Sequence, residues 1–173
     1  MPGRPRRDRL VADRYVPAME TWDALRSRRN VRRYEDRPIP ATDLDRILEA
    51  ARRTPSAGNR QHWDFVVVTE RERLQQLATV WQGARHVASS AATIALVAPQ
   101  STDQRDREIL QYDLGQATYG IMLMAADLGI GTGHSAVQDQ DAARRILGVP
   151  ADRNVEWLVA LGYPQDRPLA PIE

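Results

Sequence analysis

The chain has 173 residues, 42% of them hydrophobic, which predicts one globular domain with enough mass for a core. A formal net charge of +1 at pH 7 gives no reason to expect binding to nucleic acid or to an anionic membrane. The sequence contains no cysteine and no lysine. These absences exclude disulfides, thiolate nucleophiles, Cys-ligated metal centres and lysine Schiff bases. We therefore expect a small-molecule partner and, for an enzyme, an organic cofactor that supplies the reactivity.

The histidines and the apolar runs exclude two further classes. His62, His86 and His134 lie far apart in the sequence, without the close spacings of metal motifs, so no metal site is predicted. No apolar run reaches the roughly 18 residues that a membrane span needs. The arginine-containing N-terminus is not followed by the apolar stretch of a signal peptide. The expected location is therefore cytoplasmic.

The first 18 residues are rich in arginine and proline and carry few apolar residues, which predicts a flexible N-terminal arm before a domain over 19–173. A short helix is predicted over 20–29, with Thr21 as its cap. That helix delivers a run of arginines, and two prolines then end regular structure.

The next helix is predicted to begin at Thr42, which with Asp45 resembles a capping box with a shortened acid. A strand follows over 65–68, where the lack of polar alternation is typical of a strand covered on both faces. The helix over 108–128 is apolar on most of its circumference, so we expect it to be buried centrally and against a second subunit. The other expected elements are helices over 70–81, 86–92 and 139–147 and strands over 93–98 and 155–161.

Three segments have the composition of ligand-binding elements, and the first is an arginine cluster. Arg28, Arg29 and Arg32 are spaced within one turn just beyond a predicted helix. Guanidinium groups form paired hydrogen bonds with phosphate, so the cluster is a candidate phosphate site. The alternative is a solvated basic face that pairs with Glu35 and Asp36.

The second segment is the loop that precedes the first strand. Pro55 fixes one φ angle and Gly58 frees another, while Ser56, Asn59 and Gln61 offer short polar side chains. Such a loop can place its main chain against a flat ring. The alternative is an ordinary connection between a helix and a strand.

The third segment, GIGTGHSA, contains Gly129, Gly131 and Gly133 and is predicted to be a turn after the long helix. It is not a dinucleotide fingerprint, because it lacks G-x-G-x-x-G and follows a helix. Its glycines would let backbone N–H groups approach a ligand closely. The alternative is a helix C-cap followed by a tight turn.

Four stretches together resemble the flavin-dependent nitroreductase family in order and spacing: RSRRNVRRYEDRPIP, LEAARRTPSAGNRQHWDFVVV, DLGQATYGIMLMAADLGIGTG and VALGYP. The resemblance implies an α+β sandwich with a central, mostly antiparallel sheet flanked by helices. It also implies an intertwined homodimer with two FMN sites at its interface. The implied activity is hydride transfer from NAD(P)H to a flat acceptor such as a nitroaromatic or a quinone, carried by the flavin and by no catalytic side chain.

Carried over position by position, the first motif would contact the FMN phosphate, ribityl chain and pyrimidine edge. The loop from Pro55 to Gln61, here called the amide loop, would surround the ring, and its last two polar residues would serve the partner subunit's flavin. The glycine-rich segment would lie near the hydride-accepting ring nitrogen. The residues implied are Arg28, Arg29, Asn30, Arg32, Pro55, Ser56, Ala57, Asn59, Gln61, Gly131, Thr132, Gly133 and His134.

The chain departs from the family pattern at three places. Asn30 replaces the usual serine, and His62 replaces a common proline. The chain ends at Glu173, where relatives continue into a basic tail, so Arg167 is the remaining candidate for the tail's phosphate contact. A reduced affinity for FMN is expected from that difference.

Two other functions and one other cofactor stay open at this stage. The arginine motif and the amide loop also resemble the synthase that makes dimethylbenzimidazole from flavin, which has an aspartate where this chain has Asn30. A non-catalytic flavin-binding or flavin-sequestering protein would carry the same binding segments. A deazaflavin could replace FMN, because the loop around the ring would look alike.

Overall fold

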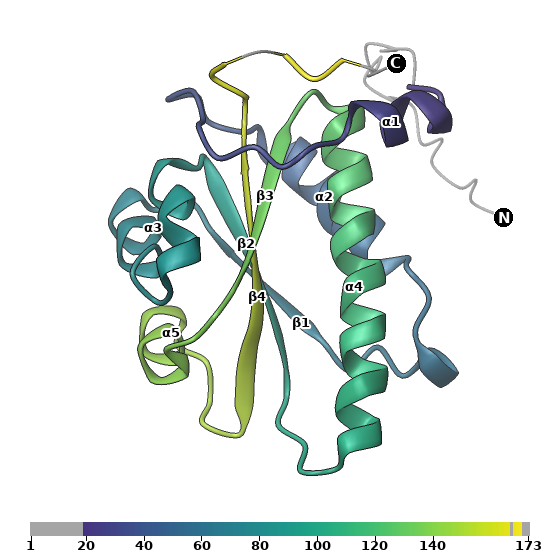
Figure 1. Ribbon diagram of the computed structural model, residues 1–173, viewed down its shortest axis with the longest axis vertical. Coiled ribbons are helices and arrows are strands. Elements are labelled where there is room, and N and C mark those ends of the chain that lie inside the picture. Colours follow the sequence, from purple (N-terminus) through teal and green to yellow (C-terminus); the bar gives the residue numbers. More distant parts are fainter. Residues whose placement is uncertain (1–18, 167, 171–173) are drawn as a thin grey trace, which may run out of the picture.

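A four-stranded antiparallel sheet forms the centre of the protein, with helices on both faces (Figure 1). The computed structural model describes residues 19–166 and 168–170. Its strands, in the spatial order β1-β2-β4-β3, are β1 (Asp64–Val68), β2 (Ala92–Pro99), β4 (Arg153–Gly162) and β3 (Gly131–Ala136). Its helices are α1 (Thr21–Ser27), α2 (Ala41–Arg52), α3 (Arg71–Leu77), α4 (Gln104–Asp127) and α5 (Gln140–Leu147), with 3₁₀ turns η1 (Ala57–Asn59) and η2 (Gln82–Ser89).

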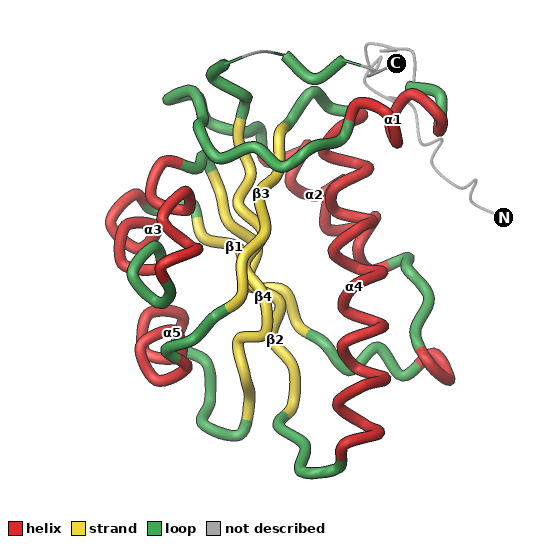
Figure 2. Tube along the Cα trace, in the orientation of Figure 1, coloured by secondary structure: helices red, strands yellow, loops and turns green. Residues whose placement is uncertain are grey.

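Helices cover both faces of the sheet, so the protein has three layers (Figure 2). Along β2, Ala95 and Val97 pack in the core beneath α3, η2 and α5, whereas Ile94 and Leu96 pack in the core beneath α2 and α4. A strand buried on both faces has no place for polar alternation, which is why its sequence reads as a continuous apolar run. The predicted α+β sandwich with an antiparallel sheet is confirmed.

The long helix α4 crosses the sheet next to α2 and begins earlier than predicted. Asp103 caps it, accepting a hydrogen bond from the backbone N–H of Asp106 at 2.8 Å. Gly120 permits the close approach of α2, since a Cβ there would lie 2.7 Å from the Thr54 side chain. Tyr112 is 73% exposed, so the described residues leave part of this helix uncovered.

The predicted N-caps are wrong. Helix α1 is preceded by Glu20 and helix α2 by Pro40, and neither residue makes a side-chain capping bond. Pro40 suits the start of α2, because its fixed φ is compatible with the entry into a helix and the missing N–H costs nothing there. The predicted arm over 1–18 lies outside the described residues.

The glycine-rich segment is a strand, not the predicted turn. Gly131 to Ala136 form β3, which pairs with β4, and the strand expected to be third is therefore the fourth. Of the three glycines only Gly129 has a positive φ, at 71°, where it ends α4. Gly131 and Gly133 serve close packing instead, since a Cβ on Gly133 would lie 2.4 Å from the Val31 carbonyl oxygen.

Candidate functional site

The arginine segment lies across β3, so two of the three candidate segments meet. The backbone N–H of Val31 donates to the Thr132 carbonyl at 2.7 Å, and Asn30 forms a parallel bridge with Thr132. Tyr34 is buried beside these strands and donates its hydroxyl proton to the Val31 carbonyl at 2.7 Å. These contacts hold Arg28 to Arg32 at the edge of the sheet.

A cavity of about 320 Å³ lies between this segment, the sheet and one face of α4. Arg28 projects into it as the C-cap of α1, with its guanidinium 5.5 Å from the centre of the Tyr119 ring and 3.8 Å from the Met122 sulfur. Its Nε is buried and has no hydrogen-bond partner among the described residues. The lining residues are Arg28, Gln111, Gly115, Thr118, Tyr119, Met122, His134 and Trp157.

A second residue that lines the cavity, His134, has a buried polar atom without a partner in the residues that the structure describes. Within the described part of the chain, Nδ1 of His134 makes no hydrogen bond. The His134 ring meets Trp157 edge-on, with 6.3 Å between the ring centres. Burial lowers the pKa of His134 below its ordinary value, and the charges of Arg28 and Arg32 lower it further. A neutral imidazole beside two guanidinium groups suits a ligand that carries negative charge and hydrogen-bonding atoms.

The amide loop lies on a different face of α4. Its backbone N–H at Ala57 donates to both carboxylate oxygens of Asp113, at 3.0 and 3.2 Å. On α4, the cavity of the arginine segment is lined by residues 111, 115, 118, 119 and 122, whereas a second hollow, beside the loop, is lined by 108, 109, 112, 113 and 116. At 3.6 residues per turn, these two sets occupy adjacent sides of the helix. One chain therefore does not bring the loop to the cavity that contains Arg28.

Residues 25–163 match the family model described as the nitroreductase family. The chain belongs to this family. A protein of Archaeoglobus fulgidus, provisionally named NADH dehydrogenase/NAD(P)H nitroreductase, is 35% identical over 151 residues, which are 85% of this chain and 87% of that protein. The solved structure of an FMN-dependent nitroreductase from Clostridium difficile R20291 has a TM-score of 0.77 at 26% identity and covers 87% of this chain and 91% of that one.

A more distant relative bears on the alternative function. The 5,6-dimethylbenzimidazole synthase of Rhodobacter capsulatus is 27% identical over 182 residues, covering 85% of this chain and 86% of that protein. Together these findings confirm the predicted nitroreductase family and the oxidoreductase class of the enzyme.

The structure brings some of the predicted site residues together and places others apart. Arg28 and His134 line the same cavity, and Asn30 bridges to Thr132. Arg29 instead donates to the Pro168 carbonyl at 2.5 Å. Asp36, the predicted partner of the basic face, pairs with Arg71, and Arg33 pairs with Asp166. The predicted residues of the amide loop do not line the cavity that contains Arg28; they are Pro55, Ser56, Ala57, Asn59 and Gln61. Arg167 lies outside the described residues.

Sequence reasoning missed the contribution of α4 to the cavity. Gln111, Gly115, Thr118 and Met122 line it, and their spacing of three to four residues places them on one face. Small and polar residues at helical spacing in a mostly apolar helix were the available signal. Trp157 comes from β4 and holds Gln111 through a hydrogen bond of 2.9 Å from its indole N–H.

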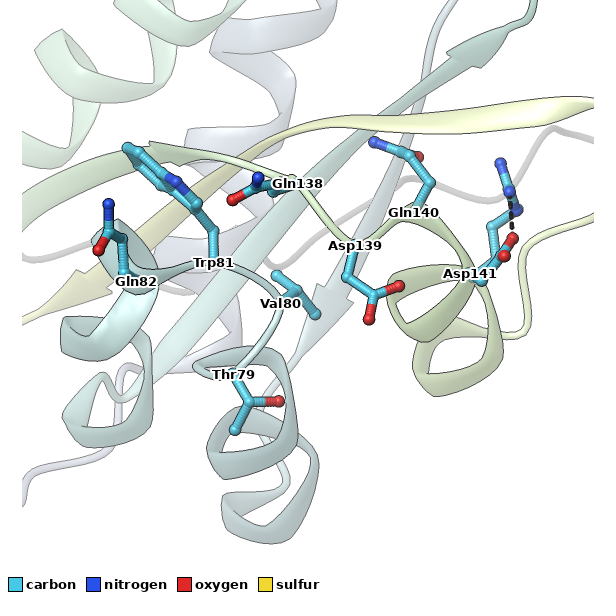
Figure 3. A pocket seen from close by; sticks show the side chains of 9 residues that line it. Thr79, Val80, Trp81, Gln82, Gln138, Asp139, Gln140 and Asp141 are labelled. Carbon is cyan, nitrogen blue, oxygen red and sulfur yellow. Dashed lines mark hydrogen bonds and ion pairs between the residues drawn. The ribbon is translucent and has the colours of Figure 1, made fainter.

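A larger groove, of about 650 Å³, lies elsewhere, between the end of α3 and the start of α5 (Figure 3). Its main polar groups already have partners. Asp139 caps α5 by accepting from the N–H of Ala142, and Arg144 pairs with Asp141. Gln140 exchanges hydrogen bonds with the backbone of Val155. Because these groups are satisfied within the chain, the smaller cavity with its unpartnered atoms is the better candidate site.

The two buried histidines predict how the stability of the nitroreductase-family fold depends on pH. Burial is the main cause of a lowered pKa at both His86 and His134. Because the folded state resists protonation, stability is fully present above pH ~6.5, the pKa of an unfolded histidine, and falls as the pH drops below it. The slope is at most about 1.4 kcal/mol per pH unit for each histidine, and less for the half-buried His134.

Urea unfolding of the cofactor-free protein at pH 7.5, 6.5 and 5.5 measures this slope. We expect His134→Gln to flatten it, because glutamine does not titrate. An unfolding free energy that is constant from pH 7.5 to 5.5 would contradict the prediction.

Proposed function

We propose that this nitroreductase-family protein is an FMN-dependent oxidoreductase that transfers hydride from NAD(P)H to a flat acceptor such as a nitroaromatic or a quinone. The observation that carries the proposal is a cavity lined by both Arg28 and His134, each of which also has a buried polar atom without a partner among the described residues. Unpartnered buried groups are costly, so a site that retains two of them is suited to a ligand that binds them. The names of relatives, an FMN-dependent nitroreductase and an NAD(P)H nitroreductase, support the same cofactor and reductant.

The residues of the cavity fit the parts of FMN. Arg28 and the nearby Arg32 supply positive charge for the phosphate or for the ring edge that becomes anionic on reduction. Trp157 and Tyr119 offer aromatic surface at the walls, and His134 can donate or accept one hydrogen bond. When bound, FMN supplies the two-electron chemistry, and the chain's own residues bind and orient it and exclude water. No side chain is assigned as a catalytic acid or base.

The amide loop completes the proposed site only if two subunits combine. Asn59 and Gln61 are exposed, and the loop that carries them is bonded to α4 through Ala57 and Asp113, neither of which lines their own chain's Arg28 cavity. Trp22 on α1 is 66% exposed, and Tyr112 and Tyr119 on α4 are 73% and 40% exposed. We propose that these faces form a homodimer in which each loop contributes to the flavin site of the other subunit. Arg29, and Arg167 in the tail, stay proposed phosphate contacts.

An absorbance spectrum tests the proposed function directly. The purified protein, incubated with FMN and freed of excess cofactor, should keep flavin absorbance, and NADH or NADPH added without oxygen should bleach it. A nitroaromatic or a quinone should then restore the colour. Protein that never retains flavin would contradict the proposal.

The same preparation separates the alternatives. Bound FMN that neither NADH nor NADPH bleaches indicates a flavin-binding protein. Dimethylbenzimidazole detected by mass after aerobic incubation with reduced FMN indicates the synthase reaction. Retention of a deazaflavin in preference to FMN would change the proposed cofactor, but the proposed binding site would stay the same.

A further inference from the structure

Asp113 is a buried carboxylate near the middle of α4 that begins the stretch DLGQATYGIMLMAADLGIGTG but is not among the predicted site residues. It is 7% exposed, among the few polar or charged side chains buried in the described chain. Both of its oxygens accept from one donor, the backbone N–H of Ala57. Burying an ionised carboxylate is costly unless hydrogen bonds compensate for the lost water. The position of this group at the base of a loop therefore calls for a role beyond packing.

The loop that Asp113 holds has an uncommon backbone conformation. Asn59 and Gln61 have φ angles of +54° and +51°, in the left-handed region that residues with side chains rarely adopt, and Gly58 between Ala57 and Asn59 has +60°. Such conformations persist where the surroundings fix them.

Two bonds inside the loop help to fix it. The N–H of Gln61 donates to Ser56 Oγ at 3.1 Å, and the Gln61 amide donates to Asn59 Oδ1 at 3.0 Å. Asn59 and Gln61 are both exposed, so few packing contacts hold them in place. The internal bonds shape the loop, but they do not join it to the rest of the protein.

The bond from Ala57 to Asp113 joins the loop to a rigid, 24-residue helix. We propose that Asp113 is a positioning residue that fixes the Pro55–Gln61 loop in the shape that binds the flavin of the second subunit. This inference rests on the proposed function, because the loop has a partner to bind only if that site exists. It assigns to α4 a double role, since one face lines the subunit's own cavity and another face holds the loop offered to the other subunit.

The chemistry of the pair explains why a carboxylate serves better than an amide. An ionised carboxylate only accepts hydrogen bonds, so either oxygen can take the Ala57 N–H. An asparagine keeps one accepting oxygen and adds an NH₂ group that must find its own partner. Asp113→Asn should therefore keep part of the function, whereas Asp113→Leu, which is branched at the same carbon but cannot accept a hydrogen bond, should lose it.

Trypsin provides a readout of loop position that needs no flavin. Arg60 lies within the loop and is exposed, so the bond after it is a cleavage site whose rate reports on local release. In the cofactor-free protein we expect Asp113→Leu to speed cleavage after Arg60 by roughly tenfold or more, and Asp113→Asn by less. Mass spectrometry identifies the cut site, and cleavage throughout the chain would instead show global unfolding.

FMN affinity, measured by the quenching of flavin fluorescence, provides the second readout. We expect the dissociation constant to rise roughly tenfold or more in Asp113→Leu and by a smaller factor in Asp113→Asn. Asp106→Asn is the matched control, because Asp106 is an exposed carboxylate in the first turn of the same helix. It should leave both measurements within about twofold of the wild type.

The outcomes separate this inference from the proposed function. A wild type that binds no FMN would refute the proposed function, and with it this inference. A loop that is released in Asp113→Leu while FMN affinity stays unchanged would overturn the positioning role alone, as would cleavage after Arg60 at the wild-type rate. If Asp113→Leu does not fold, the graded effect of Asp113→Asn against Asp106→Asn decides the question on the same two measurements.

Discussion

Replacing Arg28 by alanine should weaken FMN binding by roughly 10- to 150-fold. The guanidinium lies in the cavity against Tyr119 and Met122, and its Nε has no partner in the described chain. A hydrogen bond between a charged group and a ligand is worth about 1.5 to 3 kcal/mol, which corresponds to this range of dissociation constants. Titration of the cofactor-free protein with FMN, followed by flavin fluorescence, measures the effect.

Two matched variants show whether charge, shape or position matters. Arg28→Lys keeps the charge but loses the planar fork, so it should recover only part of the affinity. Arg33→Ala removes an arginine of the same segment that is exposed and paired with Asp166, so FMN affinity should change little. Equal losses in Arg28→Ala and Arg33→Ala would mean that the segment attracts FMN only through its overall charge, which would contradict the assignment of Arg28.

The parts of the fold that sequence predicted well are those in which a local pattern reflects burial. The segments 65–68, 93–98 and 155–161 became β1, β2 and β4, and the burial of β2 on both faces explains its unbroken apolar run. Most helices were predicted from apolar residues repeated every three to four positions. The helix predicted over 86–92 was wrong, because that region is the 3₁₀ turn η2 (Gln82–Ser89) and Ala92 begins β2. The ends of the other helices were less accurate, since Glu20 and Pro40 begin helices without a side-chain cap.

Strand β3 could not be predicted in this way, because its sequence is determined by a neighbour that is distant in the chain. Glycine is a poor strand former, so GTGHSA reads as a turn. Gly131 would meet the Val31 side chain at 2.6 Å if it carried a Cβ, and Gly133 would meet the Val31 carbonyl. The glycines thus make room for the arginine segment, a contact across 100 residues that no local pattern reveals.

The candidate site likewise contains residues that the sequence predicted and residues that only the structure reveals. Family resemblance placed Arg28 and His134 together, and the structure puts both in one cavity. Asp113 and Trp157 were not among the predicted site residues: Asp113 begins the stretch DLGQATYG, but no role was implied for it, and Trp157 reads as an aromatic residue in a strand. Their importance depends on which face of α4 or of the sheet they occupy, which follows only from the packing of whole elements.

Replacing Tyr34 by alanine should lower the free energy of unfolding by about 3 to 5 kcal/mol, the usual cost of removing a large buried aromatic ring. Tyr34 is 5% exposed and packs against Gly162, where a Cβ would lie 2.7 Å from its ring. Its hydroxyl also donates to the Val31 carbonyl, so Tyr34 links the arginine segment to the sheet through both its ring and its hydroxyl. Urea unfolding monitored by circular dichroism measures the loss.

Tyr34→Phe separates the ring from the hydroxyl. It keeps the packing and loses one hydrogen bond, so the expected cost is about 0.5 to 1.5 kcal/mol. Burial raises the pKa of Tyr34, so the folded wild type holds this proton where an unfolded tyrosine would release it. Stability should therefore fall as the pH rises above about 10 in the wild type, and less in Tyr34→Phe. Equal costs for Tyr34→Phe and Tyr34→Ala would assign the fastening of the arginine segment to the hydroxyl and contradict the role of the ring.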